Sequence, residues 1–453
     1  MKNAMTAQRP SKIMRVIDRL CTAPTNYAVL TYKEQLFILF WRVMHRQNSL
    51  GNGIMLLWML LQFALSFILT PVAFILHLCG YRFLSVDLTQ IGSVIWLELY
   101  MRDNLTGAKR PKNKIIVARS RITDGNAFAF NLYGSYYTFV YSPLLRVLLY
   151  PFFINIFFQE RVAPYEHTFT MRKNLDPDEP CIAQGVYQKY QKQFGKPLCQ
   201  LTDEQVALGK KQLSTLMNFD RPFITLHVRD SHFYNEKHFS LRNSNVHDYE
   251  LAIKWLISEG YIVVRAGTST AAPIDDMLSR CGPNLVDYAK SSIQSDFLDC
   301  FLASECEFYL GVSSGFTFLP PIFETPSCYT NFYNPMQSLG FCKGDLTSFK
   351  KFRWIKDDTL VPFHDILREP YNRNLSLAAL TDMGIKVVDN TPEEILETVQ
   401  EFLNFDPENL SDIQKMAKQE MPVWNYCYNA DGNFSNTILK EYHLDKIKTP
   451  QIS

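Results

Sequence analysis

The chain has 453 residues, a formal net charge of +1, and a composition that is 47% hydrophobic and 14% aromatic. This length exceeds one ordinary hydrophobic core, so we expect two large domains and an additional segment. The hydrophobic fraction excludes a disordered protein. Because no stripe of interleaved arginine and aromatic residues runs through the chain, we expect no nucleic acid partner.

The ten cysteines form neither a Cys-x-x-Cys pair nor a Cys/His cluster with zinc spacing. This distribution is typical of a protein whose thiols stay reduced and mostly buried, as they do in the cytosol.

Residues 1–82 are predicted to form a basic arm and a membrane-associated helical segment. The charged residues among the first fifty are the cations Lys2, Arg9, Lys12, Arg15, Arg19, Lys33, Arg42 and Arg46 and the acids Asp18 and Glu34. A basic arm ahead of an apolar run is typical of a segment that faces the cytoplasm and anionic lipid.

The apolar run covers residues 54–79, and its length suffices to span a bilayer of about 30 Å. Its polar interruptions are Gln62, Ser66, Thr70 and His77. Pro71 near the middle removes a backbone donor and tends to break a helix. We therefore favour a re-entrant insertion with both flanks in the cytoplasm over a true span. A buried helical hairpin in a soluble protein is the third possibility.

An N-terminal Rossmann-like domain with a linker is predicted for residues 83–220. A strand at 83–87 leads through a Gly-Ser turn into an apolar-periodic helix around residues 96–100. A second strand covers residues 114–118.

The rest of this first domain is less regular. Residues 136–158 are rich in Leu and Phe, and they form either the core helix of the domain or an interfacial surface that leans on a bilayer. Residues 159–220 are polar and suit loops, with a linking helix around residues 203–217.

A C-terminal Rossmann-like domain is predicted for residues 221–430. The expected strands are 223–228, 261–265, 285–287, 307–310 and 327–331, and the expected helices are 248–258, 273–281, 294–304 and one that begins at Phe316. Strands that alternate with helices indicate a parallel sheet covered on both faces. Residues 431–453 are expected to be a loosely attached tail.

Two polar side chains directly follow the first strand of the C-terminal domain. His227 and Arg229 stand at the carboxyl edge, where open α/β sheets bind ligands. An arginine there can hold a diphosphate through two parallel charge-assisted hydrogen bonds. The alternatives are a salt bridge from Arg229 to Asp230 or Asp287, and an ordinary hydrogen-bonding role for His227.

A Gly-Ser turn, residues 311–315, lies between a predicted strand and the helix that begins at Phe316. Backbone N–H groups and the helix dipole make such a place an anion site, so Ser313, Ser314 and Gly315 are predicted to bind phosphate. By itself the turn is weak evidence, because any strand-to-helix corner favours glycine and serine.

Two more segments are predicted to line the same crevice. The polar loop 240–245 contains Arg242 and Asn243, which either contact sugar or phosphate or belong to a solvated loop. Arg265 and Gly267 end the next strand.

In the N-terminal domain, Gly92 and Ser93 allow close approach of a ligand to the backbone. Glu98, Asp124 and His167 are the candidates for a base that activates an acceptor hydroxyl. Such a base must come within about 3 Å of that hydroxyl. Each of these residue types is also common in ordinary salt bridges.

No metal ion is expected, because Asp275-Asp276 lies inside a predicted helix and is a poor metal ligand pair for a nucleotide sugar. Arginines and helix termini would then neutralise the charge that develops on a leaving diphosphate.

Three stretches together resemble a family of bacterial GT-B glycosyltransferases that occurs with surface-polysaccharide genes. They are residues 223–230 with Arg242-Asn243, residues 260–267, and residues 310–315. The resemblance covers about residues 83–332 and is densest after Pro222. The His-Val-Arg stretch is also similar, more distantly, to the His-x-Arg motif of fucosyltransferases of the same fold, in which the arginine holds the donor diphosphate.

The resemblance implies a GT-B fold, in which two Rossmann-like domains face a cleft. It implies donor binding in the C-terminal domain by Arg229 and by the turn at Ser313-Ser314-Gly315, and acceptor binding in the N-terminal domain. The family often has a histidine where this chain has Ser93, which leaves the catalytic base open. The fucosyltransferase motif has a second arginine where this chain has Asp230, so a GDP-fucose donor does not follow.

On these grounds we expect transfer of a sugar from a nucleotide-sugar donor to a lipid-linked or surface-polysaccharide acceptor, such as lipopolysaccharide or capsule. We expect inversion at the sugar carbon, neither cofactor nor metal, and a location at the cytoplasmic face of a bacterial inner membrane. The alternatives are a nucleotide-sugar epimerase of the same fold and a non-catalytic membrane component of a polysaccharide assembly complex.

Overall fold

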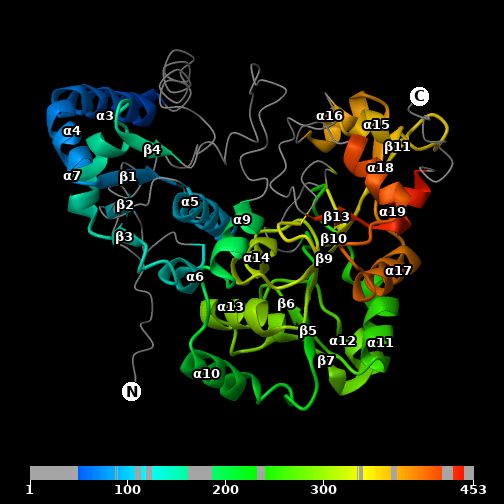
Figure 1. Cartoon of the computed structure of the whole chain (residues 1–453). Helices are drawn as coiled ribbons and strands as arrows, with labels where there is room; N and C mark the ends of the chain where they lie inside the picture. Colours follow the sequence, from blue (N-terminus) through cyan, green and yellow to red (C-terminus); the bar gives the residue numbers. More distant parts are fainter. Residues whose placement is uncertain are drawn as a thin grey trace. The chain divides into compact units, whose positions relative to one another are not determined.

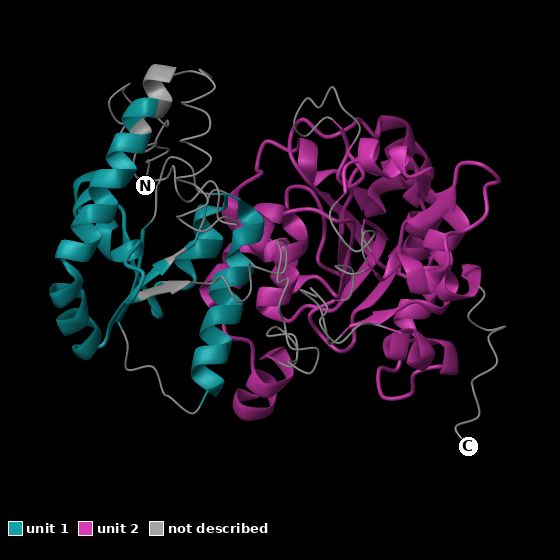
Figure 2. Ribbon diagram, turned by 90° about the horizontal axis from the view of Figure 1, so that it is seen from above, with its two compact units in different colours: residues 1–167 teal, residues 168–453 magenta. Residues whose placement is uncertain are grey.

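The computed structural model of the chain describes residues 49–86, 88, 90–107, 114–118, 125–161, 186–231, 240–333, 335, 340–368, 375–420 and 432–442. The chain forms two compact units, residues 1–167 (unit 1) and residues 168–453 (unit 2) (Figure 2).

Unit 1 contains a parallel sheet in the order β3-β2-β1-β4. Its strands are β1 (Tyr81–Ser85), β2 (Lys114–Ala118), β3 (Tyr137–Val140) and β4 (Gln159–Arg161). Parallel neighbours require crossover connections, and α5 (Val94–Thr106), α6 (Ala127–Asn131) and α7 (Pro143–Phe153) lie in them (Figure 1). The predicted first α/β domain is thus present, although β3 and β4 were not expected.

Two helices precede this sheet, α3 (Ser49–Ile68) and α4 (Thr70–Leu78). The apolar run breaks at Leu69, and Pro71 occupies the first turn of α4, where its missing N–H costs no helical hydrogen bond. Among the described helices, none alone has the length and apolar character to cross a membrane. Residues 56–68 and 70–78 meet that criterion only as a pair, with a bend of 58° between them.

The predicted boundary after residue 82 is wrong in one respect, because α3 and α4 are part of unit 1. Met59 and Phe63 of α3 pack against Tyr150 and Ile154. Ala73 of α4 packs in one cluster with Phe83 of β1 and with Phe152 and Phe153 of α7. The helical segment therefore covers the sheet of this unit and is not a separate module.

Unit 2 contains a seven-stranded parallel sheet in the order β13-β10-β9-β8-β5-β6-β7. Its strands are β5 (Phe223–His227), β6 (Ile262–Ala266), β7 (Leu285–Val286), β8 (Tyr309–Gly311), β9 (Ser327–Phe332), β10 (Leu346–Phe349) and β13 (Asn433–Phe434). The predicted parallel sheet of the C-terminal domain is confirmed, with strand bounds within about two residues of those expected.

The helices of unit 2 lie in the connections between strands and at the C-terminal side. They are α9 (Val186–Phe194), α10 (Asp203–Leu213), α11 (Glu250–Ser258), α12 (Asp275–Cys281), α13 (Asp296–Glu305), α14 (Pro320–Phe323), α15 (Phe363–Ile366), α16 (Leu377–Asp382), α17 (Pro392–Leu403), α18 (Asp412–Glu420) and α19 (Asn436–Glu441). A short antiparallel pair, β11 (Lys351–Trp354) and β12 (Ile385–Val388), joins them.

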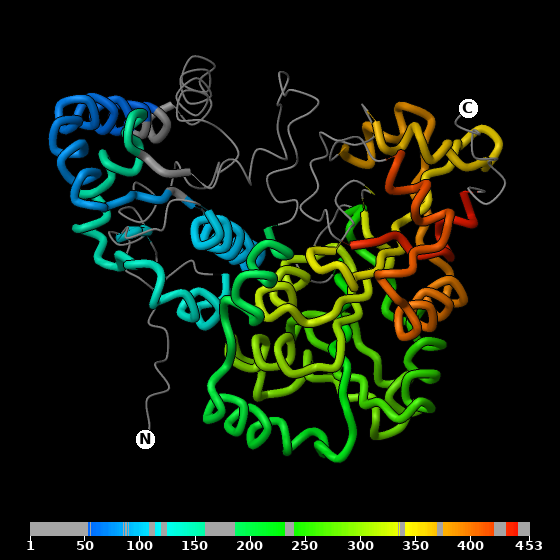
Figure 3. The backbone as a smooth tube through the Cα atoms, in the orientation of Figure 1, coloured from blue at the N-terminus to red at the C-terminus, as the bar shows by residue number. Residues whose placement is uncertain are grey.

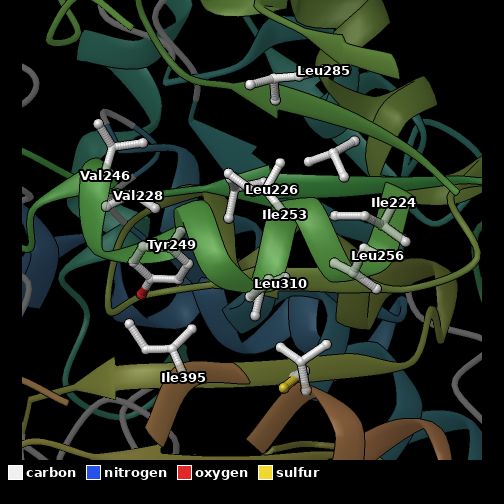
Figure 4. Close-up of a cluster of buried hydrophobic side chains, with 14 of the residues drawn as sticks. Ile224, Leu226, Val228, Val246, Tyr249, Ile253, Leu256, Leu285, Leu310 and Ile395 are labelled. Carbon is white, nitrogen blue, oxygen red and sulfur yellow. The ribbon is translucent and has the colours of Figure 1, made fainter. Parts of the chain in front are cut away.

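The main core of unit 2 lies between β5, α11 and α17. Leu226 of β5, Ile253 of α11, Leu310 of β8 and Ile395 of α17 are fully buried in one cluster (Figure 4). This core holds the strand that ends at His227 in place, so the carboxyl edge of the sheet stands on a rigid base.

Two further boundaries differ from the sequence prediction. Helix α10, expected in a linker of the N-terminal domain, belongs to unit 2, where Gly209 lies so close to the ring of Phe301 that a Cβ would clash. The expected tail also begins too early. β13 pairs with β10, and Phe434, Ile438 and Leu439 are buried in a core cluster, where Figure 3 shows this red segment among the orange ones.

Candidate functional site

The strand order of unit 2 fixes where a ligand would bind. From β7 to β10 the order is that of a Rossmann sheet, and the chain reverses direction between β5 and β8. His227 pairs in register with Gly311, so both strands end at the same level. Residues that directly follow β5 and β8 therefore meet at a switch point, which is the usual ligand position in open α/β sheets.

His227 is held in a defined orientation at this edge. Its Nδ1 lies 3.1 Å from Oγ of Ser314, and its ring stacks on Phe316 with centroids 5.1 Å apart and planes 8° apart. Burial, and then the charge of Arg265, lower the pKa of His227 to about 4. The imidazole is therefore neutral at pH 7 and serves as a hydrogen-bonding group, not as a cation.

Arg229 lies at the same edge and is 8% exposed. Its Nη1 donates hydrogen bonds to Oγ of Ser240 at 2.8 Å and to Oδ1 of Asn243 at 2.7 Å. The backbone N–H of Ser244 donates to the carbonyl of Arg229 at 2.9 Å. The loop that follows β5 thus wraps this arginine and fixes its guanidinium through neutral oxygens.

Arg242 links the two loops of the switch point. Its side chain is exposed, and its Nε donates to the carbonyl oxygen of Ser313 at 3.2 Å. The structure therefore brings His227, Arg229, Arg242 and Asn243 together at one edge, as the sequence predicted.

Lys350 supports this loop from below and was not predicted from the sequence. It follows β10 and is 1% exposed. Its Nζ donates to the carbonyl of Asn243 at 2.5 Å and to Oδ1 of Asp389 at 2.7 Å. Burial lowers the pKa of Lys350, and the Asp389 carboxylate opposes that shift. The only sequence signal is a lysine at the end of an apolar strand, which does not reveal a contact with a loop 107 residues away.

Arg265 has a different environment from Arg229. It is 1% exposed, and its Nη1 donates to the carbonyl of Ala272 at 2.7 Å and lies 3.3 Å from Oδ2 of Asp287. Its Nη2 lies 3.7 Å from Oδ2 of Asp230. The two carboxylates considered as partners for Arg229 therefore surround Arg265, and this arginine belongs to a buried ion cluster.

Gly267 follows β6 with φ of +152°, a conformation that disfavours side chains, and its carbonyl accepts a hydrogen bond from Nε2 of Gln294. This residue shapes the turn beside the ion cluster.

The Gly-Ser turn does not have the predicted helix behind it. A three-residue 3₁₀ turn (Phe316–Phe318) and the four-residue α14 follow, too short for a helix dipole to build up. The Ser314 hydroxyl contacts His227 and also Thr317, at 3.0 Å. Ser313, Ser314 and Gly315 thus orient His227 and Arg242, and the expectation of an anion site at a helix N-terminus is wrong here.

In unit 1, Gly92 and Ser93 form a 3₁₀ turn that leads from β1 into α5. A side chain at Gly125 would clash with the backbone of Gln90 and Ile91, so two loops touch at this edge. Glu98 is fully buried, accepts a hydrogen bond from Nε of Arg102 at 2.5 Å, and accepts another from the Tyr133 hydroxyl. This is the environment of a structural ion pair. Asp124 and His167 lie outside the described residues.

Among the described residues, no group of three or more His, Cys, Asp or Glu side chains has the arrangement of a metal site. The sequence also contains an Asp-x-Asp triplet at residues 176–178, which the expectation of a metal-free site does not take into account. It lies outside the described residues.

No protein-family model matches the chain, and no curated protein sequence matches it either. Two solved structures are distantly similar. One is the ADP-heptose lipopolysaccharide heptosyltransferase II of E. coli, with a TM-score of 0.35, 14% identity, and coverage of 72% of this chain and 98% of the other. The second is a family 9 glycosyl transferase from Veillonella parvula, with a TM-score of 0.30, 10% identity, and coverage of 55% and 80%. At these scores neither similarity defines the function of this chain.

Proposed function

We propose that unit 2 binds the diphosphate of a nucleotide sugar at the carboxyl edge of β5 and β8, and that the chain transfers the sugar to an acceptor. The observation that carries this proposal is Arg229 at the switch point of a Rossmann-type sheet, fixed by Ser240 and Asn243. Arg242 adds a second guanidinium from the same loop. Planar guanidinium groups match phosphate oxygens in charge and geometry.

The chemistry at this edge would be electrostatic. Negative charge builds on the diphosphate as the sugar carbon separates from it, and fixed positive groups stabilise that charge without reorganisation. His227, neutral and oriented by Ser314 and Phe316, would add a hydrogen bond to the donor. The proposal is for inverting transfer without a cofactor or metal.

The acceptor that we propose is a lipid-linked or surface-polysaccharide glycan, used at the cytoplasmic face of a bacterial inner membrane. What supports a lipid-linked acceptor is the apolar outer surface of unit 1. The residue that would remove the acceptor proton is not assigned, because the buried ion pair of Glu98 does not suit that role.

The first experiment measures the thermal midpoint of the purified full chain with nucleoside diphosphates and their sugars, together with diphosphate release when glycan acceptors are added. A nucleotide at about one hundred times its dissociation constant stabilises the native state by roughly 2.7 kcal/mol. For Arg229→Ala we expect binding weaker by about tenfold to hundredfold, because charge-assisted hydrogen bonds contribute about 1.5–3 kcal/mol.

A matched control is Arg280→Ala, which removes an arginine of the same unit from an exposed ion pair with Glu250. This variant should bind nucleotides as the wild type does. Interconversion of nucleotide sugars without release of diphosphate would identify an epimerase instead. Binding without any turnover, or no protection by any nucleotide at millimolar concentration, would favour a non-catalytic component.

A further inference from the structure

The outer helices of unit 1 carry a continuous set of exposed apolar side chains, here named the apolar face. Its members are Ile54, Leu57, Leu60, Leu61, Phe67 and Ile68 on α3, Val72, Phe74, Ile75 and Leu78 around α4, Leu144, Leu145 and Leu148 on α7, and Ile156 and Phe157 after it. Helix α3 contacts α4 and α7, and Figure 1 shows the three together on one side of the unit 1 sheet. In unit 2, by contrast, the exposed large apolar residues are scattered singly.

The polar side chains of the same helices point the other way. Gln62 and Ser66 of α3 are 3% and 2% exposed. Nδ2 of Asn155 donates to the carbonyl of Ser66 at 2.8 Å and to Oγ1 of Thr70 at 3.2 Å. In a water-exposed helix the apolar residues face the protein and the polar ones face solvent. Here that order is inverted, which indicates that the outside of these helices is not meant to face water.

Charge is also absent from the apolar face. Residues 49–78 contain no Asp, Glu, Lys or Arg, and the single charged residue of α7, Arg146, is 3% exposed. Positive groups stand only at the border, where Arg82 donates to the carbonyl oxygens of His77 and Tyr81 and where Lys114 lies 5.2 Å from the Tyr81 ring centroid. A lysine and a tyrosine beside an apolar surface are typical of the interface between lipid tails and head groups.

The packing of α3 and α4 also determines how deeply they can enter a bilayer. Met59 and Phe63 are engaged with α7, and Ala73 with β1 and α7, so one side of each helix is occupied by the unit's own core. A helix that spans a bilayer alone would expose Gln62 and Ser66 to lipid, which is costly for polar groups. The bend of 58° between α3 and α4 suits two helices that lie in one leaflet.

We propose that unit 1 inserts its apolar face into one leaflet of an anionic bilayer, with α3, α4 and α7 lying in the plane of the membrane. Charge complementarity favours lipid over a second copy of the chain, because the sequence ahead of α3 carries eight cations and two acids. The inference stands on unit 1 alone and goes beyond the proposed function by naming the surface that meets lipid.

The test is flotation of the detergent-depleted full chain with vesicles of neutral phosphatidylcholine, and with vesicles that also contain phosphatidylglycerol. We expect flotation with both, at least tenfold stronger with the anionic vesicles at low salt and nearly equal at high salt. Leu57→Glu, Ile75→Glu and Leu148→Glu should each lower partitioning to neutral vesicles by about tenfold or more, since each places a charge among lipid tails.

The matched control is Leu208→Glu, at a singly exposed leucine of α10 in unit 2, which should float as the wild type does. Nucleotide protection is measured on the same samples, so that a folding defect is distinguished from lost insertion and a failed donor site from a failed membrane face. Unchanged flotation of all three unit 1 variants would overturn the proposal. So would a wild type that does not float but forms dimers that these substitutions dissociate, which would identify a second copy as the occupant.

Discussion

Helices α7 of unit 1 and α17 of unit 2 both pack on a parallel sheet, yet their outer surfaces differ completely. Helix α17 buries Ile395 and Val399 and exposes Glu393 and Glu397. Helix α7 turns Arg146 inward, and about half or more of each side chain of Leu144, Leu145 and Leu148 is exposed. The comparison shows that the same α/β layering can be adapted to two surroundings, because only the residues on the outer helix face need to change.

The largest expected difference between the two helices is in stability. Ile395→Ala removes a fully buried side chain of the unit 2 core and should lower the free energy of unfolding of that unit by about 2–5 kcal/mol. Leu148→Ala should change the stability of unit 1 by less than about 0.5 kcal/mol, because Leu148 is 58% exposed. Hydrogen exchange of the amides in each unit, in the same mild detergent, measures both values. An equally large loss for Leu148→Ala would mean that protein covers the apolar face.

The second expected effect concerns the pH dependence of unit 2. The folded pKa of His227, about 4, is below its model value of 6.5. The stability that neutral His227 provides is therefore complete above pH 6.5 and is lost as the pH falls toward 4, because the unfolded chain then binds an additional proton. We expect this loss to be about 1–3 kcal/mol for the wild type and to be missing in His227→Gln. Unfolding of the two proteins at pH 7 and pH 4.5 gives the difference directly, and parallel curves would contradict the assigned environment.

The smallest expected effect separates two adjacent buried lysines. Lys350 holds the loop of Arg229 through Asn243, whereas Lys351 pairs with Glu394 of α17 at 2.5 Å. Lys350→Met should weaken nucleotide binding by about tenfold, as one hydrogen bond of a charged group supports the loop. Lys351→Met should lower stability by a similar amount and leave binding unchanged. Calorimetric titration of both variants decides this, and equal effects on binding would show that Lys350 has no special role.

Most of the unit 2 sheet could be predicted from the sequence, because strands such as β5 and β6 are continuous apolar runs bounded by turns. In unit 1, β3 lies inside a long stretch of Leu and Phe, where four residues of strand cannot be told from the helix that follows. β13 has only two residues, and its burial depends on Phe349 and Phe363, which are distant in the sequence. Strand pairing of that kind leaves no local pattern.

The candidate site shows the same limit. His227 and Arg229 could be predicted because the end of a parallel strand determines their position. The partners of Arg265 and the support from Lys350 could not, because they come from elements more than twenty residues away. The length of the helix after the Gly-Ser turn was also misjudged, since two consecutive prolines, Pro320 and Pro321, begin a new short helix there.

The position of β13 and α19 has a consequence for synthesis of the protein. Phe434, Ile438 and Leu439 complete a core that also contains Phe349 and Phe363, so unit 2 cannot finish folding until residue 442 has left the ribosome. Unit 1 has its whole sheet once residue 161 is available. Since domains generally fold in order of their synthesis, the N-terminal unit would be folded, with its outer leucines and phenylalanines ready for lipid, while the C-terminal unit is still incomplete.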